Sequence, residues 1–191
     1  MELPESYKIF LLNYSKIGYD NPEISFQIVS FGFYELILND FIKIVADDNS
    51  EIMVRQINRT ENKFYNLLLR PFQDKVMSLN KYIFRVGIYG NHIANAYSRY
   101  SIKKVLIAEL EKLDILKRKK LLFINRYRID EKVKNGLRNF QYEDAKRNLA
   151  DKVKIKVGLD NNYYEIFNNI VEKELNSIIN PYGLGVSMLG K

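Results

Sequence analysis

The strongest hydrophobic pattern in the chain lies between residues 21 and 39. Asn21 and Pro22 are typical of a helix start, with the asparagine as N-cap and the proline at the first helical position. Apolar residues then recur every three or four positions on one face, and a second set occupies the opposite face. The first set is Ile24, Ile28, Phe31, Tyr34 and Leu38, and the second is Phe26, Val29, Phe33 and Leu36. Because a helix that is apolar nearly all round is usually buried, we expect this helix at the centre of the fold.

Other segments also have helical spacing or helix-boundary residues. The clearest amphipathic stripe runs from residue 91 to residue 114. We expect further helices at 4–13, at 60–70 (capped by Thr60 and ended before Pro71), from Ser78 with an interruption near Gly87 and Gly90, at 142–156, and at 161–180 before Pro181. Residues 130–141 are ambiguous, because Val133, Leu137 and Phe140 are helically spaced while Asn135-Gly136 is a strong turn dipeptide.

Two β-rich stretches each follow a predicted helix. FIKIVADDNSEIMVRQI (41–57) has short strands on either side of a polar DDNS turn, and ILKRKKLLFINRYRI (115–129) is a second hairpin candidate. The pattern therefore predicts a mainly α protein, a single domain of packed helices around the central apolar helix, with two short β-hairpins. We expect residues 1–180 to form that domain and residues 181–191 to be a loose tail.

Composition narrows the function classes. The 191 residues are 47% hydrophobic and fit one domain. The chain has no cysteine, which excludes disulfides, thiolate zinc sites and a cysteine nucleophile. The first residues, MELPESYKIFLLNYSK, lack the basic region of a signal peptide, and no apolar run approaches the ~20 residues that span a bilayer. We therefore expect a cytoplasmic protein that can meet a membrane only at its surface.

Positive charge is concentrated in one segment. The formal net charge is +7, and residues 99–128 alone contain ten Lys or Arg against three acids. Such a concentration predicts a polyanionic partner. Within it, the stretch KRKKLLFINRYR (117–128) places four apolar residues between two groups of cations.

Catalytic chemistry has little support in the sequence. His92 is the only histidine, and its position after Gly90-Asn91 suggests the first turn of a helix and a capping or packing role. There is no nucleophile elbow, no phosphate-binding glycine loop and no metal-ligand spacing. We expect no enzyme, no metal site and no organic cofactor.

Three interpretations of the basic stretch remain open: a solvated hairpin that faces the core, the wing of a winged-helix nucleic-acid-binding protein, or a membrane-surface hairpin. A basic face that docks an acidic protein is a further alternative. Four consecutive apolar residues cannot all point inward on a hairpin, because side chains alternate. Phosphate binding also favours polar tips, so the sequence favours the membrane surface over nucleic acid.

Three stretches of the chain follow one another in an order known from one protein family. They are ELPESYKIFLLNYSKIGY, an opening helix; FGFYELILNDFIKI, an apolar helix that ends in Glu-Leu before a turn and a strand; and IKKVLIAELEKLDILKRKKLLFINRYRI, a basic helix followed by a hydrophobic hairpin. From about residue 2 to residue 180 this order resembles the Golgi phosphoprotein 3 family, which comprises mostly helical peripheral proteins that bind phosphatidylinositol 4-phosphate, with bacterial relatives. In that family the hydrophobic hairpin enters the membrane.

The resemblance and the charge pattern together predict which residues bind lipid. The expected headgroup-binding residues are Arg99, Lys103, Lys104, Lys117, Arg118 and Arg126, and the expected membrane-inserting residues are Leu121, Leu122 and Phe123. The family's lipid pocket also uses a Trp, which this chain lacks, an Arg where Val29 stands, and a basic pair that is here Tyr100 and Lys103. We therefore expect an anionic lipid, possible protein cargo and no nucleic acid, with the headgroup and the oligomeric state unspecified.

Overall fold

The structure is a computed structural model that describes residues 3–14, 22–46, 51–72, 76–94, 102–121, 124–174 and Ser177. Its fold is mainly α with two small antiparallel sheets, which confirms the predicted class. In chain order the elements are α1 (Glu5–Asn13), α2 (Pro22–Leu38), β1 (Ile42–Ala46), β2 (Ile52–Gln56), α3 (Lys63–Leu69), β3 (Val76–Ser78), α4 (Leu79–Ala94), α5 (Ile102–Lys112), β4 (Leu116–Leu121), β5 (Ile124–Ile129), α6 (Glu131–Gly136), a 3-10 turn (Leu137–Asn139), α7 (Tyr142–Val157), α8 (Asn161–Asn169) and a π-helical turn (Ile170–Glu174).

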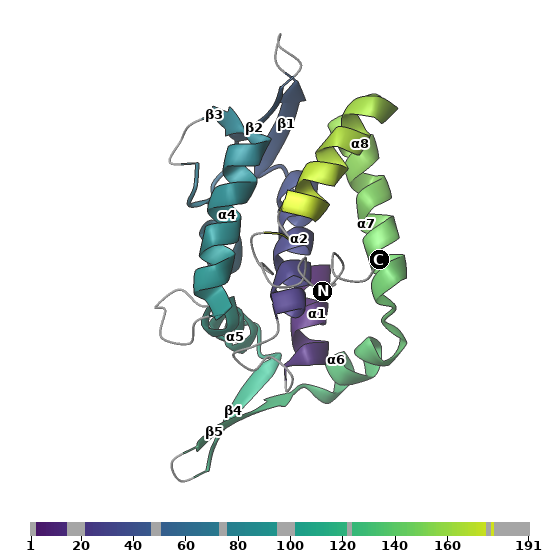
Figure 1. Cartoon of the computed structure of the whole chain (residues 1–191). Helices are drawn as coiled ribbons and strands as arrows, with labels where there is room; N and C mark the ends of the chain where they lie inside the picture. Colours follow the sequence, from purple (N-terminus) through teal and green to yellow (C-terminus); the bar gives the residue numbers. More distant parts are fainter. Residues whose placement is uncertain are drawn as a thin grey trace, which may run out of the picture.

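Helix α2 is the centre of the fold, as its pattern predicts. It contacts α1, α3, α4 and α7, and Figure 1 shows it between α4 on one side and α7 with α8 on the other. Both of its faces are buried, since Ile28 and Val29 are at most 2% exposed. At Gly32 a side chain would collide with α3, because an added Cβ would lie 2.7 Å from the ring carbon Cζ of Phe64. The glycine therefore lets the two helices approach closely.

The first predicted hairpin is part of a three-stranded sheet in the order β1-β2-β3. Its inward positions alternate with outward ones, and Ile42, Ile44, Ile52 and Val54 are buried. Strand β3 pairs with β2 and leads directly into α4. The sequence did not predict β3, because three residues are too few to display an alternating pattern.

The second predicted hairpin, β4–β5, forms a separate two-stranded sheet. Figure 1 shows it projecting from the body at the end opposite the three-stranded sheet. Its foot, where Leu116 pairs with Ile129, joins the core: Leu116 is 2% exposed, and the amide of Asp130 donates to the carbonyl of Ile115 at 2.9 Å.

The same turn leads from a helix into each hairpin. In both turns an aspartate with φ 57° follows the helix, and the amide of the next residue donates to the carbonyl five residues before it at 2.9 Å. The residues are Asp40, Phe41 and Leu36 in the first unit, and Asp114, Ile115 and Leu110 in the second. Aspartate tolerates this left-handed conformation better than most residues. The chain therefore uses one helix–turn–hairpin unit twice, with similar sequences ELILNDFIK and ELEKLDILK.

Several predicted helix boundaries are wrong. The N-cap of α3 is Asn62, whose side chain accepts hydrogen bonds from the amides of Phe64 and Tyr65, whereas Thr60 only accepts one from the amide of Asn62. Helix α4 runs without a break through Gly87 and Gly90. A helical glycine costs only about 1 kcal/mol relative to alanine, and the packing of α4 on α2 offsets that cost.

The predicted helix at 91–114 is two helices. Its first residues are the end of α4, its last part is α5, and residues 95–101 lie outside the described ranges. His92 is therefore within α4, which begins at Leu79, and not in a first turn. Residues 131–136 are helical, since α6 is capped by the Asp130 side chain, which accepts from the amide of Lys132. The tail from residue 178, including Pro181, is also outside the described ranges.

Candidate functional site

At two positions of the β4–β5 hairpin, a cationic residue on one strand lies opposite a cationic residue on the other. The strand register places Lys117 opposite Arg128 and Lys119 opposite Arg126, and neither strand contains an acid. Like charges directly opposite each other destabilise a sheet. One such pair, Lys43 with Arg55, also occurs between β1 and β2. A single pair is therefore not distinctive, but two in succession on a projecting hairpin are.

The first hairpin serves as an internal comparison for the second. At the matching position after the turn both have a buried aliphatic residue, Ile42 in β1 and Leu116 in β4. Two residues further on, β1 has the buried Ile44, whereas β4 has the exposed Arg118. The first sheet is covered by α4, which contacts β2 and β3, while β4 contacts α5 and its partner strand. At this position the second hairpin thus has an exposed cation where the first has a core-facing side chain.

An aromatic cluster joins the hairpin foot to α1 and α5. The rings of Tyr14 and Tyr127 meet edge to face, with centroids 6.1 Å apart, and the Nζ atom of Lys103 lies 5.8 Å from the centroid of Tyr14. The pKa of Tyr14 is raised, first by burial and then by the nearby Tyr127 and Glu111. The phenol therefore stays neutral and Lys103 packs against an uncharged ring, in an arrangement that places one cation of α5 beside the foot of the hairpin.

The structure brings together part of the predicted lipid-binding set. Lys103 lies partly buried at the hairpin foot, while Lys104, Lys117 and Arg118 are exposed. Arg126 and Leu121 are placed only by their strand register, opposite Lys119 and Ile124, since their side chains are outside the described set. The predicted residues Arg99, Leu122 and Phe123 also lie outside the described ranges.

Sequence reasoning left Lys119 and Arg128 out of the predicted site. The signal that could have found them is the two-residue alternation of a strand, which puts residues 117 and 119 on one face. Arg128 also contacts Glu131, with Nη2 and Oε1 3.2 Å apart and both side chains more than half exposed. An exposed pair of this kind contributes little to stability.

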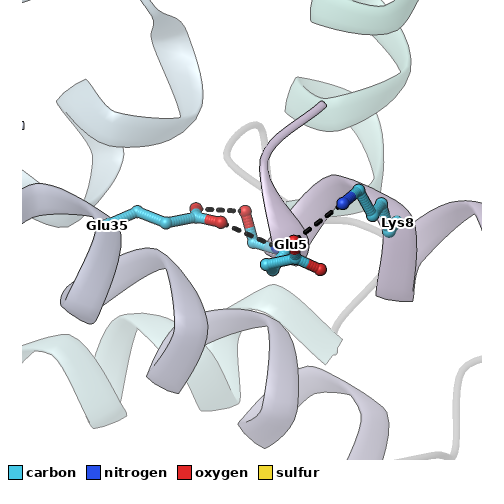
Figure 2. A network of polar contacts seen from close by, with 4 residues as sticks. Glu5, Lys8 and Glu35 are labelled. Carbon is cyan, nitrogen blue, oxygen red and sulfur yellow. Dashed lines mark hydrogen bonds and ion pairs between the residues drawn. The ribbon is translucent and has the colours of Figure 1, made fainter. Parts of the chain in front are cut away.

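A buried carboxylate, that of Glu35, contacts the first turn of α1, at the opposite end of the helix from Tyr14. The Oε1 atom of Glu35 accepts a hydrogen bond from the amide of Ser6 at 2.9 Å, and its Oε2 atom accepts from Ser6 Oγ at 2.5 Å and from Tyr65 Oη at 3.2 Å. Figure 2 shows this carboxylate meeting the first turn of α1 beside the Glu5–Lys8 ion pair. Burial raises the pKa of Glu35 to about 7, although the hydrogen bonds from Ser6 and Tyr65 lower it in part. Because its hydrogen bonds join it to Ser6 of α1 and Tyr65 of α3, we assign it to holding α1 against α2.

No group of three or more His, Cys, Asp or Glu residues is placed to hold a metal ion in the part of the chain that the structure describes. In the same ranges no helix combines the length and the apolar character that crossing a membrane requires. No family model, no curated protein and no solved structure matches the chain.

Proposed function

We propose that this protein attaches reversibly to anionic membrane surfaces through the β4–β5 hairpin and the neighbouring residues of α5. The observation that carries the proposal is the strand register, which places Lys117 opposite Arg128 and Lys119 opposite Arg126 on a hairpin that leaves the body of the fold. This arrangement opposes the hairpin's own stability, and a negatively charged partner would relieve it.

The number of cations suits reversible binding. Strands β4 and β5 contain six Lys or Arg, and each contributes ~1 kcal/mol near an anionic membrane surface. The apolar stretch LLFI (121–124) joins the two strands at the end farthest from the foot. Apolar residues beside cations suit the interfacial region of a bilayer, where headgroups and acyl chains meet. The resemblance to the Golgi phosphoprotein 3 family supports the same activity.

The main alternative is nucleic-acid binding, because a cationic hairpin after a helix also suits a phosphate backbone. The apolar tip favours lipid over nucleic acid, since only a lipid interface stabilises exposed apolar area. Binding of duplex DNA through the hairpin cations would favour this alternative.

The test is binding of the full chain to phosphatidylcholine vesicles with and without phosphatidylserine or a phosphoinositide, measured by sedimentation. The variant is Lys117→Glu with Lys119→Glu. It should still fold, because both cross-strand pairs become attractive, which stabilises the hairpin by about 0.2–1 kcal/mol per pair. It should lose affinity for anionic vesicles by at least about tenfold, since two attractions become repulsions.

The matched control is Lys43→Glu with Lys81→Glu, which changes the net charge equally. Both side chains are exposed, and Figure 1 shows β1 and the start of α4 at the end opposite the hairpin. The control should keep most of its vesicle binding. Equal losses in both variants would show that net charge alone acts. The proposal would be overturned if the wild-type protein does not sediment with anionic vesicles. It would also be overturned if the protein binds duplex DNA and this binding depends on Lys117 and Lys119.

A further inference from the structure

A cleft of about 390 Å³ lies behind the foot of the hairpin. The turn before β4, the start of α1, α6 and the 3-10 turn after it form its walls. Its apolar lining side chains are Leu3, Leu113, Ile115, Val133 and Leu137. Figure 1 shows α6 and the hairpin foot at the same end of the molecule, beside α1. The volume falls in the lower part of the range of roughly 300–1,000 Å³ that small-molecule sites occupy.

The charged groups of the described cleft lining are both cations, Lys8 and Lys132. The Nζ atom of Lys8 lies 2.7 Å from Oε1 of Glu5, which takes one of its three N–H donors and leaves two for a ligand. Lys132 is exposed on α6, at the rim. An apolar cavity with lysines at its edge matches the chemistry of an anionic amphiphile.

A second cavity has a different charge pattern. It has a volume of about 600 Å³ and lies between α1, the end of α2 and α7. Its lining includes the acids Glu5 and Glu35 as well as Lys152 and Lys156, and Lys156 already pairs with Asp40 at 2.7 Å. Its mixed charges favour neither sign of ligand.

We infer that the cleft binds a single-chain anionic amphiphile of the fatty-acid class, with its carboxylate at Lys8 and Lys132 and its chain against the apolar lining. The small volume selects one short chain over a two-chain lipid. This site does not depend on the proposed membrane attachment, because a monomeric fatty acid can reach it from water. Apolar contact with the chain would supply most of the affinity. The two ammonium groups would select an anionic headgroup over a cationic one.

The experiment titrates the full chain with monomeric decanoate by calorimetry, beside decyltrimethylammonium, which has a chain of the same length and the opposite charge. Decanoate should bind saturably and the cation should not. Lys132→Glu should weaken decanoate binding at least about fivefold. The matched control is Lys134→Glu on the same short helix, which is exposed and absent from the cleft lining, and it should change the affinity less than about twofold.

One further variant separates the cleft from the hairpin. Lys117→Glu with Lys119→Glu should keep its decanoate affinity while losing vesicle binding, because neither residue lines the cleft. Loss of decanoate binding in that variant would place the ligand on the hairpin and overturn the inference. Equal binding of both amphiphiles, no saturable decanoate binding, or equal effects of Lys132→Glu and Lys134→Glu would also overturn it.

Discussion

The buried carboxylate of Glu35 makes the stability of this protein depend on pH in a direction that is unusual for an acid. Its pKa in the folded protein is about 7, against an ordinary value of 4.5, because burial disfavours the charged form. The folded state therefore binds the proton more tightly than the unfolded state. Between pH 4.5 and 7 folding takes up a proton, so the free energy of unfolding falls as pH rises through this window.

The size of the effect follows from the width of the window. Each pH unit changes the free energy of unfolding by at most about 1.4 kcal/mol, so the Glu35 contribution declines by about 3 kcal/mol from pH 4.5 to pH 7. Glu35→Gln removes this titration while keeping a carbonyl oxygen that can accept from the Ser6 amide. We expect the variant to be close to wild type at pH 5 and more stable than wild type by about 1–3 kcal/mol at pH 8.

The assay is urea denaturation followed by circular dichroism at several pH values and constant ionic strength, with midpoints and slopes compared between the two proteins. The difference between the two pH profiles cancels the contributions of the other titratable groups, because both proteins contain them. Parallel profiles between pH 5 and pH 8 would refute the reasoning. They would mean that the three hydrogen bonds and the N-terminal end of α1 stabilise the carboxylate enough to offset its burial.

Two other predictions concern packing and the hairpin tip. Gly32→Ala should lower stability by about 1 kcal/mol and Tm by ~2–4 °C in a thermal melt, because the collision with α3 outweighs the helical preference for alanine. Gly136→Ala is its control, since an added Cβ there meets nothing within 4 Å, and equal losses in both would contradict the argument. Leu122→Ser with Phe123→Ser should lower vesicle affinity at least about tenfold without unfolding the protein. Unfolding of that variant would instead place the tip in the core. Tight, salt-dependent binding of duplex DNA that the two substitutions leave unchanged would favour nucleic acid.

Long-range burial was predictable where a pattern repeats over many residues. The seventeen positions of α2 show two apolar faces in the sequence, and both are buried in the structure. Boundaries were less predictable, because they depend on tertiary contacts. Asn62 and Thr60 are both good N-cap residues, and Asn62 also donates to Tyr7 Oη, a contact across 55 residues that no local pattern reveals.

The candidate site was predictable in composition but not in arrangement. A count of charges identifies residues 99–128, whereas the register that opposes Lys117 to Arg128 depends on where the turn falls. The repeated unit was visible in part, because the sequence predicts a helix before each hairpin. The matching letters ELILNDFIK and ELEKLDILK become meaningful only once Asp40 and Asp114 are seen in the same left-handed conformation.

Helix α1 contacts both copies of the repeated unit, Glu35 of the first through Ser6 and the hairpin of the second through Tyr14. In each unit a glutamate, 5% exposed, lies three residues before the end of the helix, Glu35 in α2 and Glu109 in α5. A negative charge near a helix C-terminus is unfavourable, so Glu35 needs a compensating contact, which the first turn of α1 supplies through Ser6. The residue that follows α1, Tyr14, contacts Tyr127 of the second unit. Helix α1 is thus held by the first unit at its start, through Ser6, and contacts the hairpin of the second unit at its end, through Tyr14.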